Sequence, residues 1–357
     1  MLLKAKKMTI NKLKTPLPEK EIIDRWSSEE VIVSVICCTY NQEKYIEDTI
    51  LGVLCQNTSY RYEFIIHDDC STDSTSNIIK KYANNYPTII KHIIPSKNIY
   101  SQGIQPGINA FSFTTGKYIA LCEGDDFWID ENKLTKQVKI LETEKNINLC
   151  FSSAYTLQPN GKIEIVANYN DQVSISSLST VIRQGGAYMP TASIIFRREV
   201  FKLFKDNFSR ASIGDYYCQI LGSIRKGAIY LPDITCVYRI NSVGSWSENR
   251  KNINKEFLIS EINEYEKYLY KLINFGADKI DIDFALADLM RINANQLFLK
   301  KEWCSSKSLI IKSWDLYKNI NRNQKKLYLY RNFLPILFLR EKIKMLLKKI
   351  NFKKKSG

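Results

Sequence analysis

From Val31 onward, short continuous apolar runs alternate with stretches in which apolar residues recur at helical spacing. The run at 31–38 is typical of a strand that is buried on both faces. Residues 43–56 then place Ile46, Ile50 and Val53 on one helical face. The alternation continues to about residue 240. It predicts strands at 63–67, 89–94, 117–122, 147–154, 192–196, 228–231 and 235–238, and helices at 73–84, 105–114, 132–144 and 215–225. This pattern indicates an α/β domain with a largely parallel sheet.

The two ends of the chain differ from this central region. Residues 1–30 are basic and then polar, and we interpret them as an N-terminal arm or linker. Residues 31–250 carry the α/β pattern. From residue 251 to residue 357 the apolar spacing is helical, and it predicts helices at 257–273, 280–300, 304–318 and 336–350. We therefore expect three parts: an N-terminal arm or linker, an α/β domain, and a helical C-terminal region with a basic amphipathic end.

Composition and charge narrow the class of protein. The 357 residues are 45% hydrophobic, which is enough for a buried core. The formal net charge of +15 favours anionic partners such as phosphates or a membrane surface. Nine cysteines without a Cys-x-x-Cys pair indicate small buried side chains in a reducing compartment. Because no signal peptide and no apolar run near ~18 residues is found, we expect a cytoplasmic protein.

Polar segments follow three of the predicted strands. They are T-Y-N at 39–41, D-D-C-S-T-D at 68–73 and E-G-D-D at 123–126. Ligands of open α/β sheets bind beyond the carboxyl ends of the strands. Carboxylates crowded there repel one another, and a divalent cation removes that repulsion. Since Mg²⁺ and Mn²⁺ take one or two carboxylates together with phosphate oxygens, the pattern predicts a metal-bridged nucleotide diphosphate.

Each acidic segment also has a purely structural interpretation. Residues 68–73 would form an Asx-type turn that caps the following helix, and 123–126 would form a surface turn. A calcium-binding loop does not fit residues 69–80. The position that requires glycine holds Ser74, and the position that requires glutamate holds Lys80.

The three segments lie in the runs VSVICCTYNQEKYIEDTI, FIIHDDCSTDST and TGKYIALCEGDDFW. In order and spacing these runs resemble the family 2 glycosyltransferases, and the resemblance spans about residues 31–240. It implies the GT-A fold, a Rossmann-like, mixed but mostly parallel sheet flanked by helices, here with a helical C-terminal extension. It also implies transfer of a sugar from a nucleotide-diphosphate sugar, with a UDP-sugar favoured, to an acceptor hydroxyl, with inversion and with Mg²⁺ or Mn²⁺.

The resemblance assigns roles to single residues. Four residues would line the nucleotide pocket: Thr39, Tyr40, Asn41 and Glu43. Asp68 would contact the base, with Asp69 as a second candidate. Asp125 would lie against the ribose or the metal, and Asp126 would bind the metal directly.

The catalytic base is expected at the start of a later helix. Inverting transfer needs a carboxylate that takes the acceptor's proton while a metal stabilises the leaving diphosphate. Family members carry a Glu-Asp pair there, and in this chain Asp215 matches the aspartate while Gly214 replaces the glutamate. The alternative is that Asp215 only caps its helix. Arg239, at the end of the last strand, is expected to contact the diphosphate, because a planar guanidinium suits paired oxygens.

Two other functions stay open. A sugar nucleotidyltransferase shares the sheet and the metal chemistry, but it is expected to show a Gly-rich Arg/Lys signature where this chain has T-Y-N. The second open function is that of a non-catalytic basic protein that binds a membrane. Nucleic acid is not an expected partner, since basic and aromatic residues are not arranged as a platform for it.

Two expectations concern the acceptor and the C-terminal helix, which could meet at a membrane surface. The resemblance implies a glycan or lipid-linked glycan acceptor in a surface polysaccharide pathway. The helix at 336–350 carries an apolar stripe among lysines and arginines. It either packs on the catalytic domain or docks on the anionic cytoplasmic face of a membrane, where lipid-linked acceptors reside.

Overall fold

The computed structural model describes residues 9–211, 214–243, 248 and 253–355. The chain divides into two compact units, residues 1–251 and residues 252–357, and each is described by itself.

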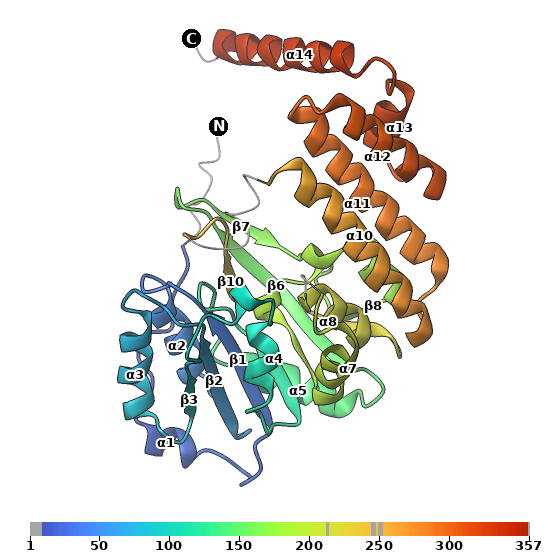
Figure 1. Cartoon of the computed structure of the whole chain (residues 1–357). Helices are drawn as coiled ribbons and strands as arrows, with labels where there is room; N and C mark the ends of the chain where they lie inside the picture. Colours follow the sequence, from blue (N-terminus) through green and yellow to red (C-terminus); the bar gives the residue numbers. More distant parts are fainter. Residues whose placement is uncertain (1–8, 212–213, 244–247, 249–252, 356–357) are drawn as a thin grey trace. The chain divides into compact units, whose positions relative to one another are not determined.

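The first unit is built on one mixed sheet, and within the described residues ten strands take part in it (Figure 1). Neighbouring strands follow the order β3-β2-β1-β4-β9-β6-β10-β5, while β7 pairs with β6 and β8 with β10. The strands are β1 (Val33–Thr39), β2 (Tyr62–Asp68), β3 (Ile90–Ile93), β4 (Tyr118–Leu121), β5 (Phe127–Trp128), β6 (Leu149–Leu157), β7 (Ile163–Val166), β8 (Ser174–Ser176), β9 (Ile195–Arg197) and β10 (Ala228–Arg239). Strands β3, β2, β1 and β4 run parallel, as do β6 and β10, so the predicted α/β architecture is confirmed.

Helices cover this sheet on both sides (Figure 1). They are α1 (Glu19–Ile23), α2 (Ile46–Leu54), α3 (Thr75–Asn85), α4 (Pro106–Phe111), α5 (Lys133–Thr143), α6 (Leu178–Gln184), α7 (Arg198–Phe208) and α8 (Gly214–Ser223). Three 3₁₀ turns lie between them: η1 (Tyr100–Gln102), η2 (Gly186–Tyr188) and η3 (Thr191–Ser193). The long apolar strands and the helices at 43–56, 73–84, 132–144 and 215–225 are therefore where the pattern predicted them.

Three predicted strands differ in the structure, and β5, β7 and β8 were not predicted. The two short strands expected at 228–231 and 235–238 are one strand, β10, because register shifts after Leu231 and Ile234 absorb the irregular residues between them. Pro232 lies in that irregular part, where a missing backbone N–H is tolerated. The strand expected at 192–196 begins as the η3 turn, and only β9 is extended.

The carboxyl ends of the parallel strands share one edge of the sheet. Thr39, the last residue of β1, pairs in register with Asp68, the last residue of β2. Leu121, the last residue of β4, pairs with Ile36 on the other side of β1. The segments 39–41, 68–73 and 123–126 therefore all leave the sheet at the same edge, as the sequence predicted.

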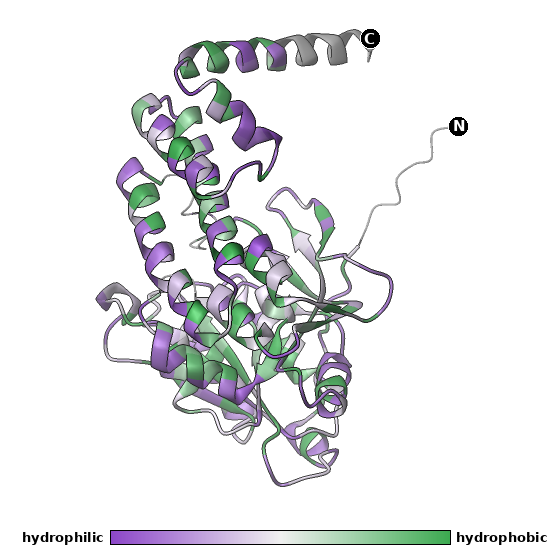
Figure 2. Ribbon diagram, turned by 90° about the vertical axis from the view of Figure 1, so that its right-hand side faces the viewer, coloured by the Kyte–Doolittle hydropathy of each residue, from purple (hydrophilic) through white to green (hydrophobic). Residues whose placement is uncertain are grey.

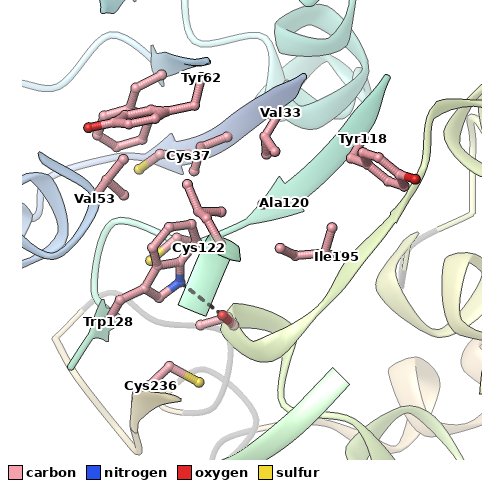
Figure 3. Packing of buried hydrophobic residues seen from close by; sticks show 14 of the residues in the cluster. Val33, Cys37, Val53, Tyr62, Tyr118, Ala120, Cys122, Trp128, Ile195 and Cys236 are labelled. Atoms are coloured by element: carbon pink, nitrogen blue, oxygen red, sulfur yellow. Dashed lines mark hydrogen bonds between the residues drawn. The ribbon is translucent and has the colours of Figure 1, made fainter. Parts of the chain in front are cut away.

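A buried cluster fills the space between the sheet and α2, α3 and α5. Figure 3 shows Cys37, Cys122, Trp128 and Cys236 within it. All nine cysteines are free, and Cys37, Cys122, Cys150, Cys218 and Cys236 are buried. The prediction that cysteines serve here as small apolar side chains agrees with these positions.

Part of the basic N-terminal segment packs against this unit. Ile22 belongs to the buried cluster, and the Trp26 ring contacts the Tyr62 ring edge-on with 5.8 Å between centroids. The Glu19 carboxylate accepts a hydrogen bond from the backbone N–H of Thr88 at 2.7 Å. Residues 17–26 of the segment that we interpret as an arm or linker thus contact the α/β unit.

The second unit is helical, as predicted for this region. It contains α10 (Lys255–Lys271), η5 (Leu272–Phe275), α11 (Lys279–Leu299), α12 (Trp303–Leu316), α13 (Arg322–Leu329) and α14 (Leu334–Lys355). Helices α11 and α12, which match the predictions at 280–300 and 304–318, pack as a hairpin (Figure 1), whereas α13 was not predicted. Across the described residues, no helix combines the length and the apolar character needed to cross a bilayer.

Candidate active site

The loops after β1 and β2 are joined by reciprocal hydrogen bonds. Asn41 adopts a left-handed conformation with φ 53°, and its side-chain oxygen accepts a bond from the backbone N–H of Thr72 at 2.8 Å. The Glu43 carboxylate accepts a bond from Ser74 N–H at 3.0 Å, and the Asp73 carboxylate accepts one from Glu43 N–H at 3.1 Å. Asparagine tolerates the left-handed region better than most residues. The T-Y-N segment and the D-D-C-S-T-D segment therefore form one rigid wall.

Asp68 and Asp69 are buried in this wall. The Asp68 carboxylate accepts hydrogen bonds from the Ser71 N–H at 3.0 Å and from the Ser76 hydroxyl. Burial raises the pKa of Asp68, but hydrogen bonds from His92, Ser71 and Ser76 outweigh it and hold the pKa below its usual value. The Asp69 oxygens accept the N–H groups of Ile99 and Tyr100 at 2.8 and 3.0 Å. Both carboxylates are satisfied by protein donors.

The acidic loop 123–126 packs directly on the first loop. A Cβ built on Gly124 would lie 2.5 Å from Thr39 Oγ1 and 2.6 Å from Thr39 Cβ, so only glycine fits. From the other side, the Thr49 hydroxyl on α2 donates to the carbonyls of Gly124 and Asp126 at 3.1 and 2.5 Å. These contacts bring the E-G-D-D segment against the T-Y-N segment.

Asp125 and Asp126 are held by the end of β10. Asp126 Oδ1 accepts the backbone N–H of Arg239 at 2.9 Å, and the Asp125 side chain accepts the Ser242 hydroxyl. Asp126 Oδ2 is buried, and among the described residues no group forms a hydrogen bond with it. Burial, together with the charges of Asp125 and Glu123, raises the pKa of Asp126 well above its usual range. A buried carboxylate with an unsatisfied oxygen is chemically suited to a proton or a cation.

Arg239 supports this loop with its side chain. Arg239 as a whole is 7% exposed, and its guanidinium forms an ion pair with Asp48 and donates to the Asp125 carbonyl at 2.5 Å. It also lies 4.3 Å from the centre of the Phe127 ring and 5.1 Å from that of Tyr45. As placed, the guanidinium is used inside the protein, and the predicted contact with a diphosphate stays a prediction.

Glu123 connects the acidic loop with Asp215. Its side chain is accessible to solvent, yet the surrounding protein and the charges of Asp125 and Asp215 raise its pKa to about 8. The charge of Asp215 reaches Glu123 although the two residues are far apart in the chain. The loop after β4 and the start of α8 therefore border one region.

Asp215 lies in the first turn of α8 and is partly exposed. Its Oδ2 accepts the Thr191 hydroxyl at 2.9 Å, and its Oδ1 accepts the Tyr216 N–H at 2.8 Å. Burial raises the pKa of Asp215, although these hydrogen bonds oppose the rise. The bond with Tyr216 N–H is a helix-terminus contact, while the bond with Thr191 comes from a different segment and fixes the direction of the carboxylate.

The replacement of the family's glutamate by Gly214 has a steric basis. A Cβ at Gly214 would lie 2.9 Å from Gln105 Oε1 and 2.9 Å from the Phe204 ring. The space that a glutamate would need is taken by Gln105 and Phe204, and Gln105 donates to the Ala211 carbonyl. Residues 212–213, which precede Gly214 in the predicted motif, lie outside the described residues.

This arrangement of strand ends can be compared with known proteins. Residues 34–204 match the family model described as glycosyl transferase family 2. Residues 34–204 of the chain are thus similar to the family 2 glycosyltransferases. The α/β unit of the chain has the GT-A fold that the resemblance implied: the 1–349 fragment of TarS from S. aureus, solved in complex with UDP-GlcNAc, superposes with a TM-score of 0.62 at 17% identity, covering 85% of this chain and 86% of that fragment.

Curated relatives match over shorter stretches. An uncharacterised protein of Mycobacterium bovis is 31% identical over 218 residues, which is 60% of this chain and 60% of the relative. The chain thus spans about three fifths of the length of the first curated relatives. The E. coli UDP-Glc:alpha-D-GlcNAc-diphosphoundecaprenol beta-1,3-glucosyltransferase WfaP is 37% identical over 115 residues, covering 32% of this chain and 43% of WfaP.

The structure brings some of the predicted site residues together and leaves others apart. Around the acidic loop it gathers Thr39, Asp125 and Asp126, with Asp215 nearby. Tyr40 is 45% exposed, so its ring is accessible at the edge of the sheet. Within the described residues, no three His, Cys, Asp or Glu side chains form a preassembled metal cage. The roles of all these residues stay predictions.

Sequence reasoning missed two residues of this region. Glu123 was part of the E-G-D-D segment but received no role, although its spacing from Asp125 is that of a D-x-D-like motif. Thr191 lies in the segment before the strand expected at 192–196, but its contact with Asp215, 24 residues away, has no local signal in the sequence.

Proposed function

We propose that this protein is a metal-dependent glycosyltransferase that moves a sugar from a nucleotide-diphosphate sugar to an acceptor hydroxyl. One observation carries the proposal: the acidic loop 123–126 packs on the T-Y-N segment at the carboxyl edge of the sheet, with Gly124 against Thr39. Beside this contact, burial and the charges of Asp125 and Asp215 raise the pKa of Glu123. Two of these carboxylates belong to the loop that contacts the T-Y-N segment, and the third starts a helix. A single ligand that spans metal, diphosphate and acceptor would use all three.

The carboxylates of the acidic loop fit a divalent cation. Asp126 has a buried oxygen without a described partner, and burial together with the charges of Asp125 and Asp215 raises the pKa of Glu123. We propose that Asp125 and Asp126 hold Mg²⁺ or Mn²⁺, which takes few protein ligands and leaves positions for phosphate oxygens. When bound, the cation would stabilise the negative charge of the leaving nucleotide diphosphate.

Asp215 is the proposed general base. Its carboxylate would accept the proton of the acceptor hydroxyl as the sugar is transferred, and the transfer would invert the anomeric centre. A pKa raised toward the working pH favours efficient general-base catalysis. Thr191 and the Tyr216 N–H would hold the carboxylate in one orientation during the transfer.

The donor and the acceptor are proposed from the named relatives and from the residues at the carboxyl edge of the sheet. UDP is named for both WfaP and TarS, and we propose a UDP-sugar donor and a glycan or lipid-linked glycan acceptor in surface polysaccharide synthesis. The exposed ring of Tyr40 and the wall formed by Asn41 and Glu43 are the proposed nucleotide contacts. Since Asp69 and Arg239 are engaged internally, we propose that they support that wall and the acidic loop.

A donor panel tests this function. UDP-glucose, UDP-GlcNAc and a GDP-sugar are added to the full chain with Mn²⁺, and thermal stabilisation and nucleotide release are measured. We expect one UDP-sugar to stabilise the protein and to release UDP slowly, with EDTA abolishing both effects. No response to any donor would refute the proposal. Pyrophosphate release from UTP and a sugar phosphate would instead identify a nucleotidyltransferase.

We also propose that α14 docks on an anionic membrane surface. Its start is packed: Leu334 and Leu337 are buried, and the Phe338 ring meets Phe298 and Trp303 at 5.7 and 5.5 Å. The same helix also exposes an apolar stripe, in which Ile336 is 63%, Leu339 59% and Ile343 48% accessible to solvent. Hydrophilic residues, several of them basic, lie between these positions (Figure 2). An apolar stripe beside positive charge is typical of helices that lie in the membrane interface.

Flotation with vesicles tests the membrane proposal. We expect the full chain to float with phosphatidylglycerol vesicles and not with phosphatidylcholine vesicles, and Leu339→Asp to abolish flotation. Leu299→Asp is the matched control, because Leu299 is equally exposed at 58% but ends α11 outside the stripe. Equal flotation of both variants, or no flotation of the unmodified chain, would refute the proposal.

A further inference from the structure

A lysine is completely buried at the start of α5. Lys133 has no solvent exposure and is the first residue of the helix, where the helix dipole disfavours a positive charge. Within the described part of the chain, no carboxylate forms an ion pair with it. Burial lowers its pKa to about 8. A leucine or methionine would cost less at this position, so the ammonium group calls for a specific explanation.

The ammonium group binds the backbone of a distant turn. It donates to the Ser193 carbonyl at 3.3 Å and to the Gln137 side chain, and it lies 4.7 Å from the centre of the Trp128 ring. Gln137 donates to the same Ser193 carbonyl at 2.8 Å. The Trp128 indole N–H donates to the neighbouring carbonyl of Ala192 at 2.9 Å, the bond drawn in Figure 3. We call Lys133, Gln137 and Trp128 the Lys133 clamp.

The turn held by the clamp carries the partner of the proposed base. Ser193 closes the turn through bonds from its N–H and hydroxyl to the Pro190 carbonyl, at 2.8 and 2.7 Å. Two residues before Ser193, the Thr191 hydroxyl donates to Asp215 at 2.9 Å. The clamp thus fixes the backbone from which the orientation of Asp215 is set.

The clamp also touches the proposed metal loop. Trp128 follows Asp126 by two residues, in β5, and pairs with β10 beside the residues that hold the loop. Arg239 on β10 stacks on Phe127, the residue between them. One buried group therefore connects the acidic loop with the turn that orients Asp215.

We propose that Lys133 is a positioning residue that, through the 191–193 turn and Thr191, aligns Asp215 with the acceptor hydroxyl. The inference rests on the proposed function. Lys133 itself touches neither donor nor acceptor. Its removal should therefore lower the rate of the transfer step and leave donor binding unchanged.

A double-mutant cycle tests the inference on the full chain. Lys133→Met keeps the length of the side chain without the charge, and Thr191→Val removes only the hydroxyl. The readout is UDP release, with water in the place of the acceptor, from the UDP-sugar that the unmodified protein turns over with Mn²⁺. We expect each variant to lower kcat about 10–100-fold, since small misplacements of a reacting group cost this much, with an unchanged donor KM. Together they should lose little more than either alone.

Three controls separate positioning from stability. Thr191→Ser retains the hydroxyl and should keep most of the activity. Lys136→Met changes the next lysine of α5, which pairs at the surface with Asp130 and Asp233, and should leave kcat unchanged. Melting temperatures identify any loss that comes from unfolding. If Lys133→Met does not fold, Gln137→Met removes a bond to the same carbonyl and takes its place in the cycle.

The outcomes are distinct. No UDP release from the unmodified protein with any donor refutes the proposed function itself. If the unmodified protein is active, the inference is overturned by unchanged kcat in Lys133→Met, by a matching rise in donor KM, or by losses that add fully with those of Thr191→Val.

Discussion

Gly124 is the point at which the acidic loop and the T-Y-N loop touch, and Gly124→Ala should separate them. The new Cβ would lie 2.6 Å from Thr39 Cβ, whereas ordinary contacts begin at 3.4 Å. Thr39 is at the end of a buried strand and cannot rotate away, so the acidic loop would have to move by about 0.8 Å. Overpacking of this kind costs ~1–3 kcal/mol.

The same displacement should affect function more than stability. A shift of about 1 Å in a catalytic group costs about 100-fold in rate, so we expect kcat/KM for UDP release to fall 10–100-fold. The melting temperature should fall by about 2–10 °C, given the usual few degrees per kcal/mol for a unit of this size. Thermal unfolding with and without Mn²⁺ and UDP measures both effects, and stabilisation by Mn²⁺ and UDP should largely disappear.

Gly107→Ala is the matched control for this prediction. A Cβ there would meet only Cys38 Sγ and the Phe201 ring, each at 3.9 Å, which is ordinary contact. Because Gly107 lies within α4, alanine should even stabilise the protein by up to ~1 kcal/mol through helix propensity. If Gly124→Ala behaves like Gly107→Ala, the close packing of the two loops does not control the site and the reasoning is refuted.

Three further predictions concern single carboxylates. Asp215→Asn should lower kcat about 10²–10⁴-fold while Mn²⁺ and donor still raise the melting temperature; loss of donor binding would contradict the role of base. Asp126→Asn should weaken Mn²⁺ binding in calorimetry at least about tenfold without lowering the stability of the metal-free protein, because it removes a buried charge. Since burial raises the pKa of Glu123 to about 8, its protonated form stabilises the fold, and in EDTA that stability should be lost as the pH rises from about 5 to about 8. Because solvent screens this exposed group, we expect the stability to fall by only ~1 kcal/mol over this pH range, or the melting temperature by about 2–4 °C. Glu123→Gln should flatten the plot of melting temperature against pH, and parallel plots for the variant and the unmodified protein would contradict this prediction.

The sheet could be predicted from the sequence because its strands are buried on both faces. Continuous apolar runs such as those of β1 and β2 have one physical explanation in a chain of this length. Helix α7 was missed although its apolar face, with Val200, Phe201, Phe204 and Phe208, is regular. It follows β9 without a loop, and a change of period inside one apolar stretch is hard to locate.

The positions of the acidic segments were predictable, but the state of each carboxylate was not. Arg239 illustrates the difference. Its position at a strand end suggested a free guanidinium for a diphosphate, yet it pairs with Asp48, 191 residues earlier in the chain. No local pattern contains such a contact. Likewise, the sequence shows that Gly214 replaces a glutamate. It does not show that Gln105 occupies the space a side chain at Gly214 would need, because Gln105 is placed there by its hydrogen bond to the distant Ala211 carbonyl.

Six carboxylates at the edge of the sheet fall into two groups, which differ in how the surrounding protein compensates their charge. Asp68, Asp69 and Asp73 receive hydrogen bonds from nearby backbone and hydroxyl groups, which compensate their charge within the protein. Burial raises the pKa values of Glu123, Asp126 and Asp215, and protein donors do not fully offset this effect. A fold retains such uncompensated charge at a cost in stability. The most economical explanation is a ligand that carries the missing positive charge to Glu123 and Asp126 and a proton to Asp215, which is what a cation-bound diphosphate sugar and an acceptor hydroxyl provide together.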